Sequence, residues 1–186
     1  ILCLDEKTHL QALERLPPTL PLRPGLVERQ EFEYVRQGTV DLFAAFDGLS
    51  GEVFAHGYQR HPNREFRHFL RALRARDPDS RWHLIVDNAG YHTKQAVLDW
   101  GAAQRPKVTL PWLPTPGSWL NQVEIWFSIV SRKCLRRASV RSTEALRALM
   151  PRFLKTWNTH FAHPFEWTYT GKPLAVAPQH YEVLAA

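Results

Sequence analysis

Two apolar runs in the sequence end in an aspartate, where α/β proteins often place functional side chains. Asp5 follows the run at residues 2–4, and Asp87 follows the run at residues 84–86. Sites in open α/β sheets lie beyond the carboxyl ends of strands. Two carboxylates close together repel each other unless a cation offsets them, and a hard divalent ion with oxygen ligands suits that role. Taken singly, each aspartate is explained better as a turn or helix cap.

Glu124 is a third carboxylate, on a helix predicted over residues 118–137. The apolar positions of this helix recur with gaps of three and four: Leu120, Val123, Phe127, Val130 and Cys134. At 100° per residue, Glu124 lies about 80° from the centre of that stripe, on an edge shared with Asn121. A solvated glutamate is the ordinary interpretation. Combined with the two aspartates, however, Glu124 suits two-metal phosphoryl chemistry with Mg²⁺.

The elements that must position these carboxylates alternate in type along the chain. Strands are predicted at 1–4, 39–47, 52–59, 82–86 and 107–113, and the second and third form a hairpin around Gly48 and Gly51. Helices are predicted at 63–76, 94–103 and 118–137, with a last helical region from Ser142. This order fits an α/β fold, a mixed sheet with helices on both faces.

Prolines interrupt the pattern in two places. Four of them, Pro17, Pro18, Pro21 and Pro24, make residues 7–38 an irregular loop or arm that touches a partner. Pro151 falls within the last helical region, which is therefore expected to form two pieces or to kink.

Composition narrows the class of protein. The 186 residues are 44% hydrophobic and 23% charged, which fits one folded domain rather than a disordered chain. The apolar runs fall short of the roughly 18 residues that a membrane span needs.

The sequence has two cysteines and no CxxC pair, which argues against a disulfide framework or a structural zinc site and favours a reducing cytosol. The net charge of +6 favours an anionic partner such as nucleic acid, although solubility alone explains many such charges.

Three ordered motifs resemble the DDE transposases of the mariner superfamily, and most closely the bacterial insertion-sequence branch. They are residues 5–7 (DEK), 86–92 (VDNAGYH) and 118–127 (SWLNQVEIWF). The 36 residues between Asp87 and Glu124 are similar to the family's spacing, as are Pro114-Thr115-Pro116 and Trp157-Asn158. The resemblance covers residues 1–173.

The resemblance implies a ribonuclease H-like fold in which Asp5, Asp87 and Glu124 are catalytic and bind two Mg²⁺ or Mn²⁺ ions. It implies that water cleaves DNA at transposon ends and that the freed 3′-hydroxyl attacks target DNA, with no covalent protein–DNA intermediate. It also implies a homodimer or larger assembly on DNA in the bacterial cytoplasm, at the nucleoid. We expect neither a membrane partner nor a small-molecule cofactor. Residues 1–186 would form a single catalytic domain without the family's N-terminal helix-turn-helix region.

Other polar residues near the motifs have two interpretations each. Asn88 could bind a metal-bound water or a phosphate, or cap a turn. His92 could assist proton transfer or contact the scissile phosphate, or cap the next helix. Asn121 is a further candidate for supporting a ligand or contacting phosphate. Glu6 would point to the opposite side of a continuing strand from Asp5, so it is only a weak supporting candidate.

DNA contacts are predicted after Glu124. The basic residues there are Arg132, Lys133, Arg136, Arg137 and Arg141. A solvated helix end would explain them, but a nuclease-like site on the same helix favours phosphate contacts, which weaken with salt. Trp119, at the start of this helix, is a candidate for contacting DNA.

Two alternatives stay open beside the transposase. A ribonuclease H-like nuclease without strand transfer would use the same carboxylates. A truncated relic would bind DNA without cutting it.

Overall fold

The computed structural model describes residues 1–16, 33–59, 63–87, 90, 95–111 and 121–166. Its strands are β1 (Leu2–Arg15), β2 (Tyr34–Asp47), β3 (Val53–Tyr58), β4 (Trp82–Ile85) and β5 (Val108–Thr109). Its helices are α1 (Asn63–Arg76), α2 (Gln95–Ala103), α3 (Val123–Ile129), the π-helix η2 (Val130–Leu135) and α4 (Thr143–His160).

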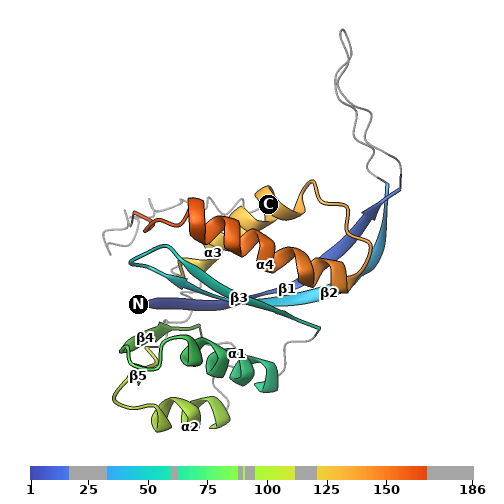
Figure 1. Cartoon of the computed structure of the whole chain (residues 1–186). Helices are drawn as coiled ribbons and strands as arrows, with labels where there is room; N and C mark the ends of the chain where they lie inside the picture. The colour runs from blue at the N-terminus through green and yellow to red at the C-terminus, as the bar shows by residue number, and fades with distance from the viewer. Residues whose placement is uncertain (17–32, 60–62, 88–89, 91–94, 112–120, 167–186) are drawn as a thin grey trace, which may run out of the picture.

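The five strands form one mixed sheet in the order β3-β2-β1-β4-β5 (Figure 1). β1 and β2 pair antiparallel, as do β2 and β3, so the predicted hairpin is confirmed. β4 pairs parallel with both β1 and β5. This topology matches the ribonuclease H-like sheet expected from the sequence.

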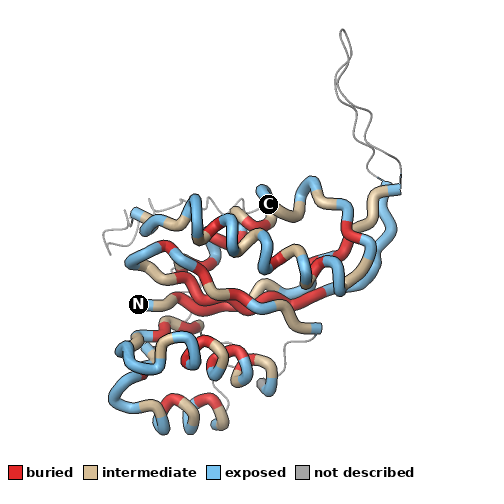
Figure 2. The backbone as a smooth tube through the Cα atoms, viewed as in Figure 1, coloured by how far each residue is buried: buried red, intermediate tan, exposed pale blue. Residues whose placement is uncertain are grey.

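Helices cover both faces of the sheet, and each face has its own buried core (Figure 2). Leu4 and Leu84 pack with α1 and α2, and Cys3 packs on the opposite face with α3, η2 and α4. Alternate side chains of a strand point to opposite faces, so neighbouring β1 residues belong to different cores. Helix α1 has the predicted bounds because its apolar residues repeat at helical spacing, and it ends just before Asp77-Pro78.

The prediction of an irregular segment over residues 7–38 is wrong for residues 7–15 and 34–38, which belong to β1 and β2. Two register shifts interrupt the pairing of these strands. At the first, His9 has a φ of 55° and its N–H donates to Asp41 Oδ1 at 2.7 Å. This bulge reverses the alternation, so Leu10 and Ala12 return to the face that holds Cys3. The four prolines on which this prediction depended lie outside the described residues.

The second half of the chain departs from the prediction at two boundaries, one of a helix and one of a strand. The described part of the helix expected over 118–137 begins at Val123, and it changes from α to π geometry at Val130. Within the described part of the strand expected over 107–113, only Val108 and Thr109 form a strand, β5. The start of the last helix, α4, agrees with the prediction: Ser142 is its N-cap, and the Ser142 side chain accepts a hydrogen bond from the Ala145 N–H at 3.0 Å.

Pro151 lies inside α4 and does not divide it into two pieces, so that part of the prediction is wrong. Leu146, Met150 and Trp157 are buried on the same core before and after the proline. Their burial stabilises one continuous helix despite the hydrogen bond that proline cannot donate. None of the helices in the described ranges is long and apolar enough to cross a membrane.

Candidate active site

Asp5 and Asp87 lie at the same level of two neighbouring parallel strands. The register pairs Cys3 with Ile85, and each aspartate follows its strand residue by two positions. Cys3 and Ile85 both pack into the core that contains α3, so strand alternation directs both aspartates to that face. The expectation that Asp5 ends its strand is wrong, because β1 continues to Arg15; it is β4 that ends just before Asp87.

The Asp5 carboxylate is only 6% exposed and is held from two sides. The backbone N–H of Glu6 donates to its Oδ1 at 2.8 Å, and Asn121 Nδ2 donates to its Oδ2 at 3.3 Å. Burial raises the pKa of Asp5 to about 6, opposed by the Glu6 N–H and assisted by the negative charges of Asp87 and Glu124. Asp87 and Glu124 are therefore each close enough for their charges to act on Asp5.

Glu6 lies nearer to this site than strand alternation suggests. Burial raises the pKa of Glu6 to about 9, with further contributions from the charge of Asp5, from a hydrogen bond with Asp5 and from the charge of Asp87. The sequence signal for a role of Glu6 at this site is its position directly after Asp5 in the DEK motif. At neutral pH the Glu6 side chain is therefore protonated and can donate to the Asp5 carboxylate.

The raised pKa values make the metal-free protein less stable as pH rises. Unfolded Asp and Glu ionise near pH 4, whereas the folded chain holds these protons up to about pH 6 for Asp5 and about pH 9 for Glu6. The unfolded state therefore gains stability between about pH 4 and pH 9. We expect Glu6→Gln to raise the melting temperature in EDTA, by an amount that grows from pH 5 to pH 8.5. Thermal melts followed by circular dichroism measure this difference.

The control for this prediction is Glu52→Gln, at an exposed glutamate in the β2–β3 turn. Its difference from the wild type should stay constant over the same pH range. A constant difference for Glu6→Gln as well would contradict the pKa assignment.

Glu124 stands in the first turn of α3, exposed and beside the core, as its edge position predicts. Its backbone N–H donates to the main-chain oxygen of Asn121 at 3.0 Å. Its charge reaches Asp5, since it contributes to the raised pKa of that residue. Among the described residues, no three Asp, Glu, His or Cys side chains form a group that could hold one ion. The three carboxylates thus share a region without forming a closed coordination shell.

The donor set nevertheless suits a hard divalent cation. All three side chains are carboxylates, the preferred ligands of Mg²⁺. A cation would offset both the burial and the neighbouring negative charges that raise the pKa of Asp5. Asn121 Oδ1 is also buried beside Asp5 and has no hydrogen-bond partner among the described residues. Such an acceptor suits a site that takes up hydrated ions. Asp5, Asp87 and Glu124 are therefore the residues that could hold metal here.

The other predicted site residues divide into two groups. Asn121 is 1% exposed and contacts Asp5, so the structure brings it to the carboxylates. Asn88, His92 and Trp119 lie outside the described residues.

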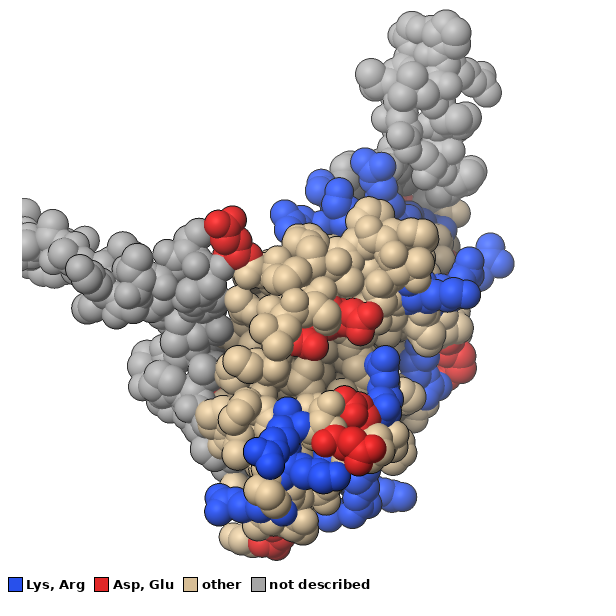
Figure 3. Space-filling view, turned by 60° about the vertical axis from the view of Figure 1, so that its left-hand side comes forward, with Lys and Arg blue, Asp and Glu red and all other residues tan. Residues whose placement is uncertain are grey.

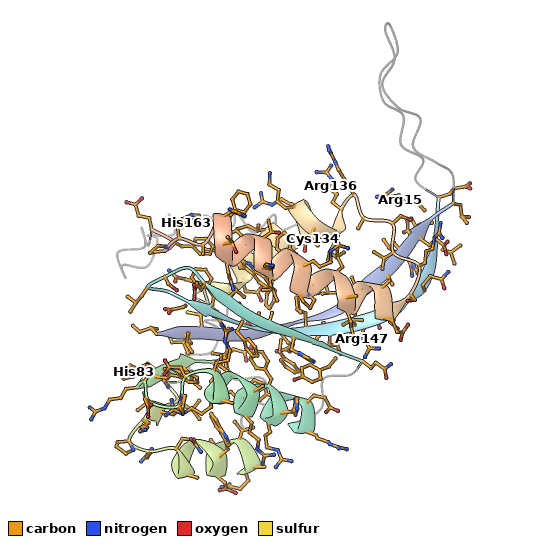
Figure 4. All side chains as sticks on the ribbon, in the orientation of Figure 1. Arg15, His83, Cys134, Arg136, Arg147 and His163 are labelled. Atoms are coloured by element: carbon orange, nitrogen blue, oxygen red, sulfur yellow. The ribbon has the colours of Figure 1, made fainter. Side chains whose placement is uncertain are left out.

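The predicted basic run is exposed at the end of the α3–η2 helix. Arg132 and Lys133 belong to η2, Arg136 and Arg137 follow it, and Arg141 precedes α4. Arg15 joins this group, because its guanidinium donates to the Arg136 main-chain oxygen at 2.7 Å. Figure 4 shows both residues toward the end of the β1–β2 ribbon that lies away from the N-terminus. Of the predicted five, Arg141 contacts a carboxylate, Glu14, at 3.4 Å. Figure 3 shows Lys and Arg gathered along the upper edge of one face and again at its lower end.

Comparison with known proteins gives matches to several solved structures and to one family model. No curated protein matches the sequence. Solved structures that match include a Mos1 transposase paired-end complex with the left transposon end (17% identity, TM-score 0.55) and a Mos1 mariner paired-end complex with Mn (17%, 0.57). A third is a pre-cleavage Mos1 transpososome (15%, 0.58). Each match covers 83% of this chain but only 47–48% of the Mos1 chain, so this chain spans about half the length of those structures.

The fold and the family agree with each other. The structural likeness confirms the ribonuclease H-like fold, with its mixed five-stranded sheet and helices on both faces. The family model described as DDE superfamily endonuclease matches residues 1–147, which include Asp5, Asp87 and Glu124. The chain therefore belongs to the DDE superfamily endonucleases.

Proposed function

We propose that this chain is the catalytic domain of a transposase of the mariner superfamily, from its bacterial insertion-sequence branch. It would cut DNA at transposon ends and join the freed 3′ ends to target DNA. The observation that carries the proposal is that the strand register places Asp5 and Asp87 on the face that carries α3, where the charge of Glu124 reaches Asp5. The Mos1 complexes with transposon-end DNA support the choice of substrate.

Asp5, Asp87 and Glu124 would hold two Mg²⁺ or Mn²⁺ ions. Bound metal would supply an activated water or hydroxyl and would stabilise the leaving oxygen of an in-line displacement. The protein holds Asp5 between the Glu6 N–H and Asn121, so that carboxylate is oriented before metal binds. Glu124 lies at the exposed margin of α3, where its carboxylate can reach a phosphodiester without full desolvation. In this proposal Asn88 and His92 contact the phosphate or its water shell.

The partners in this proposal are the transposon ends, the target DNA and a second copy of the protein. The exposed arginines and Lys133 at the end of η2 would bind DNA phosphates, and Trp119 would contact DNA at the start of the catalytic helix. Contacts of this kind raise affinity without reading sequence.

Neutralising the basic group should weaken DNA binding and reduce its dependence on salt. We expect an Arg132→Gln, Arg136→Gln, Arg137→Gln triple variant to make the negative slope of log K against log salt concentration shallower by about 2.7, since each of three lost phosphate contacts contributes about 0.9. Fluorescence anisotropy with a duplex at several salt concentrations measures this slope. Arg152→Gln, at an exposed position of α4, should leave the slope unchanged. An unchanged slope in the triple variant would exclude this surface as a DNA site.

A nicking assay on supercoiled plasmid DNA tests the proposal. The wild-type chain should nick the plasmid with Mg²⁺ or Mn²⁺ and lose this activity in EDTA. A pre-cut transposon end with a free 3′-hydroxyl should also become joined to the plasmid. Nicking without joining would favour the nuclease, and DNA binding without nicking by the folded protein would favour the relic.

A further inference from the structure

One buried asparagine contacts both elements that carry the proposed ligands. Asn121 Nδ2 donates to the Leu4 main-chain oxygen at 2.7 Å and to Asp5 Oδ2 at 3.3 Å, which ties it to β1. Its own main-chain oxygen accepts from the Glu124 N–H at 3.0 Å, in the first turn of α3. A single residue thus joins the strand of Asp5 to the helix of Glu124.

The orientation of the amide follows from its partners. Leu4 O and Asp5 Oδ2 are both acceptors, so the amide nitrogen must face them and the oxygen must point away. The side chain is 1% exposed, so water does not compete for these hydrogen bonds. The Asp5 carboxylate consequently has one oxygen fixed by its own strand, through the Glu6 N–H at 2.8 Å, and the other by Asn121.

We infer that Asn121 is a positioning residue that holds the Asp5 carboxylate and the first turn of α3 in one frame, so that Asp5 and Glu124 meet a divalent cation already oriented. This inference rests on the proposed metal-dependent function and assigns to Asn121 a role in metal affinity. Partners that orient metal ligands typically contribute about 10-fold to 100-fold in affinity or activity.

Asn158 offers a matched control, because it makes a similar attachment away from the carboxylates. Its Oδ1 accepts from the Val53 N–H at 2.9 Å and its Nδ2 donates to the Val53 oxygen at 2.8 Å, joining α4 to β3. Replacing either asparagine by leucine keeps the approximate size and removes two side-chain hydrogen bonds between a helix and a strand.

The experiment measures Mn²⁺ affinity of the full 186-residue chain by electron paramagnetic resonance of free Mn²⁺, at a temperature where circular dichroism shows each variant folded. We expect Asn121→Leu to raise the Kd for Mn²⁺ at least about 10-fold. Asn158→Leu should lower the melting temperature and leave the Kd within about twofold of the wild type. Asn121→Ser, which keeps one donor and is smaller, should fall between wild type and Asn121→Leu, and it serves in place of the leucine variant if that one does not fold.

The outcomes separate this inference from the proposal on which it rests. Equal Kd values for the Asn121 variants and the wild type would overturn the positioning role and leave the metal-dependent function intact. Equal weakening in the Asn121 and Asn158 variants would also overturn it, since a general loss of stability would then explain both. Failure of the wild type to bind Mn²⁺ would overturn the proposed metal chemistry and this inference with it.

Discussion

Glu124→Gln should reduce metal-dependent nicking by at least about a thousandfold. The substitution keeps the size of the side chain and removes its negative charge, so it removes a proposed metal ligand without disturbing the exposed first turn of α3. Metal assistance of phosphoryl transfer contributes several kcal/mol, and each 1.36 kcal/mol corresponds to tenfold in rate. The rate is measured on supercoiled plasmid with Mg²⁺ and again with Mn²⁺.

The control is Glu144→Gln, which changes an exposed glutamate in the first turn of another helix, α4. It should nick at the wild-type rate, because Glu144 contacts Thr143 and Arg147 and lies apart from the proposed ligands. DNA affinity and melting temperature should stay near wild type for Glu124→Gln. If Glu124→Gln nicks as fast as Glu144→Gln, Glu124 has no part in catalysis.

Of the Gly→Ala changes at the described glycines, Gly51→Ala should cause the largest loss of stability. Gly51 ends the β2–β3 turn with a φ of +75°, a conformation that L side chains rarely adopt. A Cβ there would lie 1.9 Å from the main-chain oxygen of His163, which cannot move independently of the chain after α4. Left-handed strain and overpacking together cost about 3 kcal/mol. For a chain of this size we expect a melting temperature about 10 °C lower.

Gly48→Ala, in the same turn, is the matched control. Its Cβ would meet the Gln122 side chain at 3.4 Å, an ordinary van der Waals contact, and Gly48 lacks the positive φ. The melting temperature should change by less than about 4 °C, since a Gly→Ala change at a compatible position is worth less than about 1 kcal/mol. Similar melting temperatures for the two variants would contradict the close packing of residues 51 and 163.

Local patterns predicted the helices better than the long strands. The bounds of α1 follow from four apolar residues at helical spacing and from Pro78, all within one segment. The far half of β1 is different, because its partners in β2 lie 19 to 30 residues away and its alternation changes face at His9. The π geometry of η2 was not predicted either, because apolar residues spaced three and four positions apart fit both an α-helix and a π-helix. The continuity of α4 across Pro151 depends on tertiary burial, which overrides the local preference.

The carboxylates were predictable as residues, but their surroundings were not. Strand ends and the three motifs identify Asp5, Asp87 and Glu124 from the sequence, and their catalytic role stays a prediction. Simple alternation placed Glu6 on the opposite face, yet the folded chain brings its carboxyl to Asp5. The contacts of Asn121 join residues more than a hundred positions apart, so they depend on how α3 packs against β1.

Strand β1 is bonded to the chain near both ends of the α3–η2 helix. Before α3, Asn121 bonds to Leu4; after η2, the Arg15 guanidinium donates to the Arg136 oxygen and the Val140 N–H donates to the Leu13 oxygen, each at 2.7 Å. An attachment at one end alone would let the helix rotate over the strand, whereas attachments at both ends resist that rotation. We therefore expect a force applied through DNA at the basic residues after η2 to change the separation of Asp5 and Glu124 little.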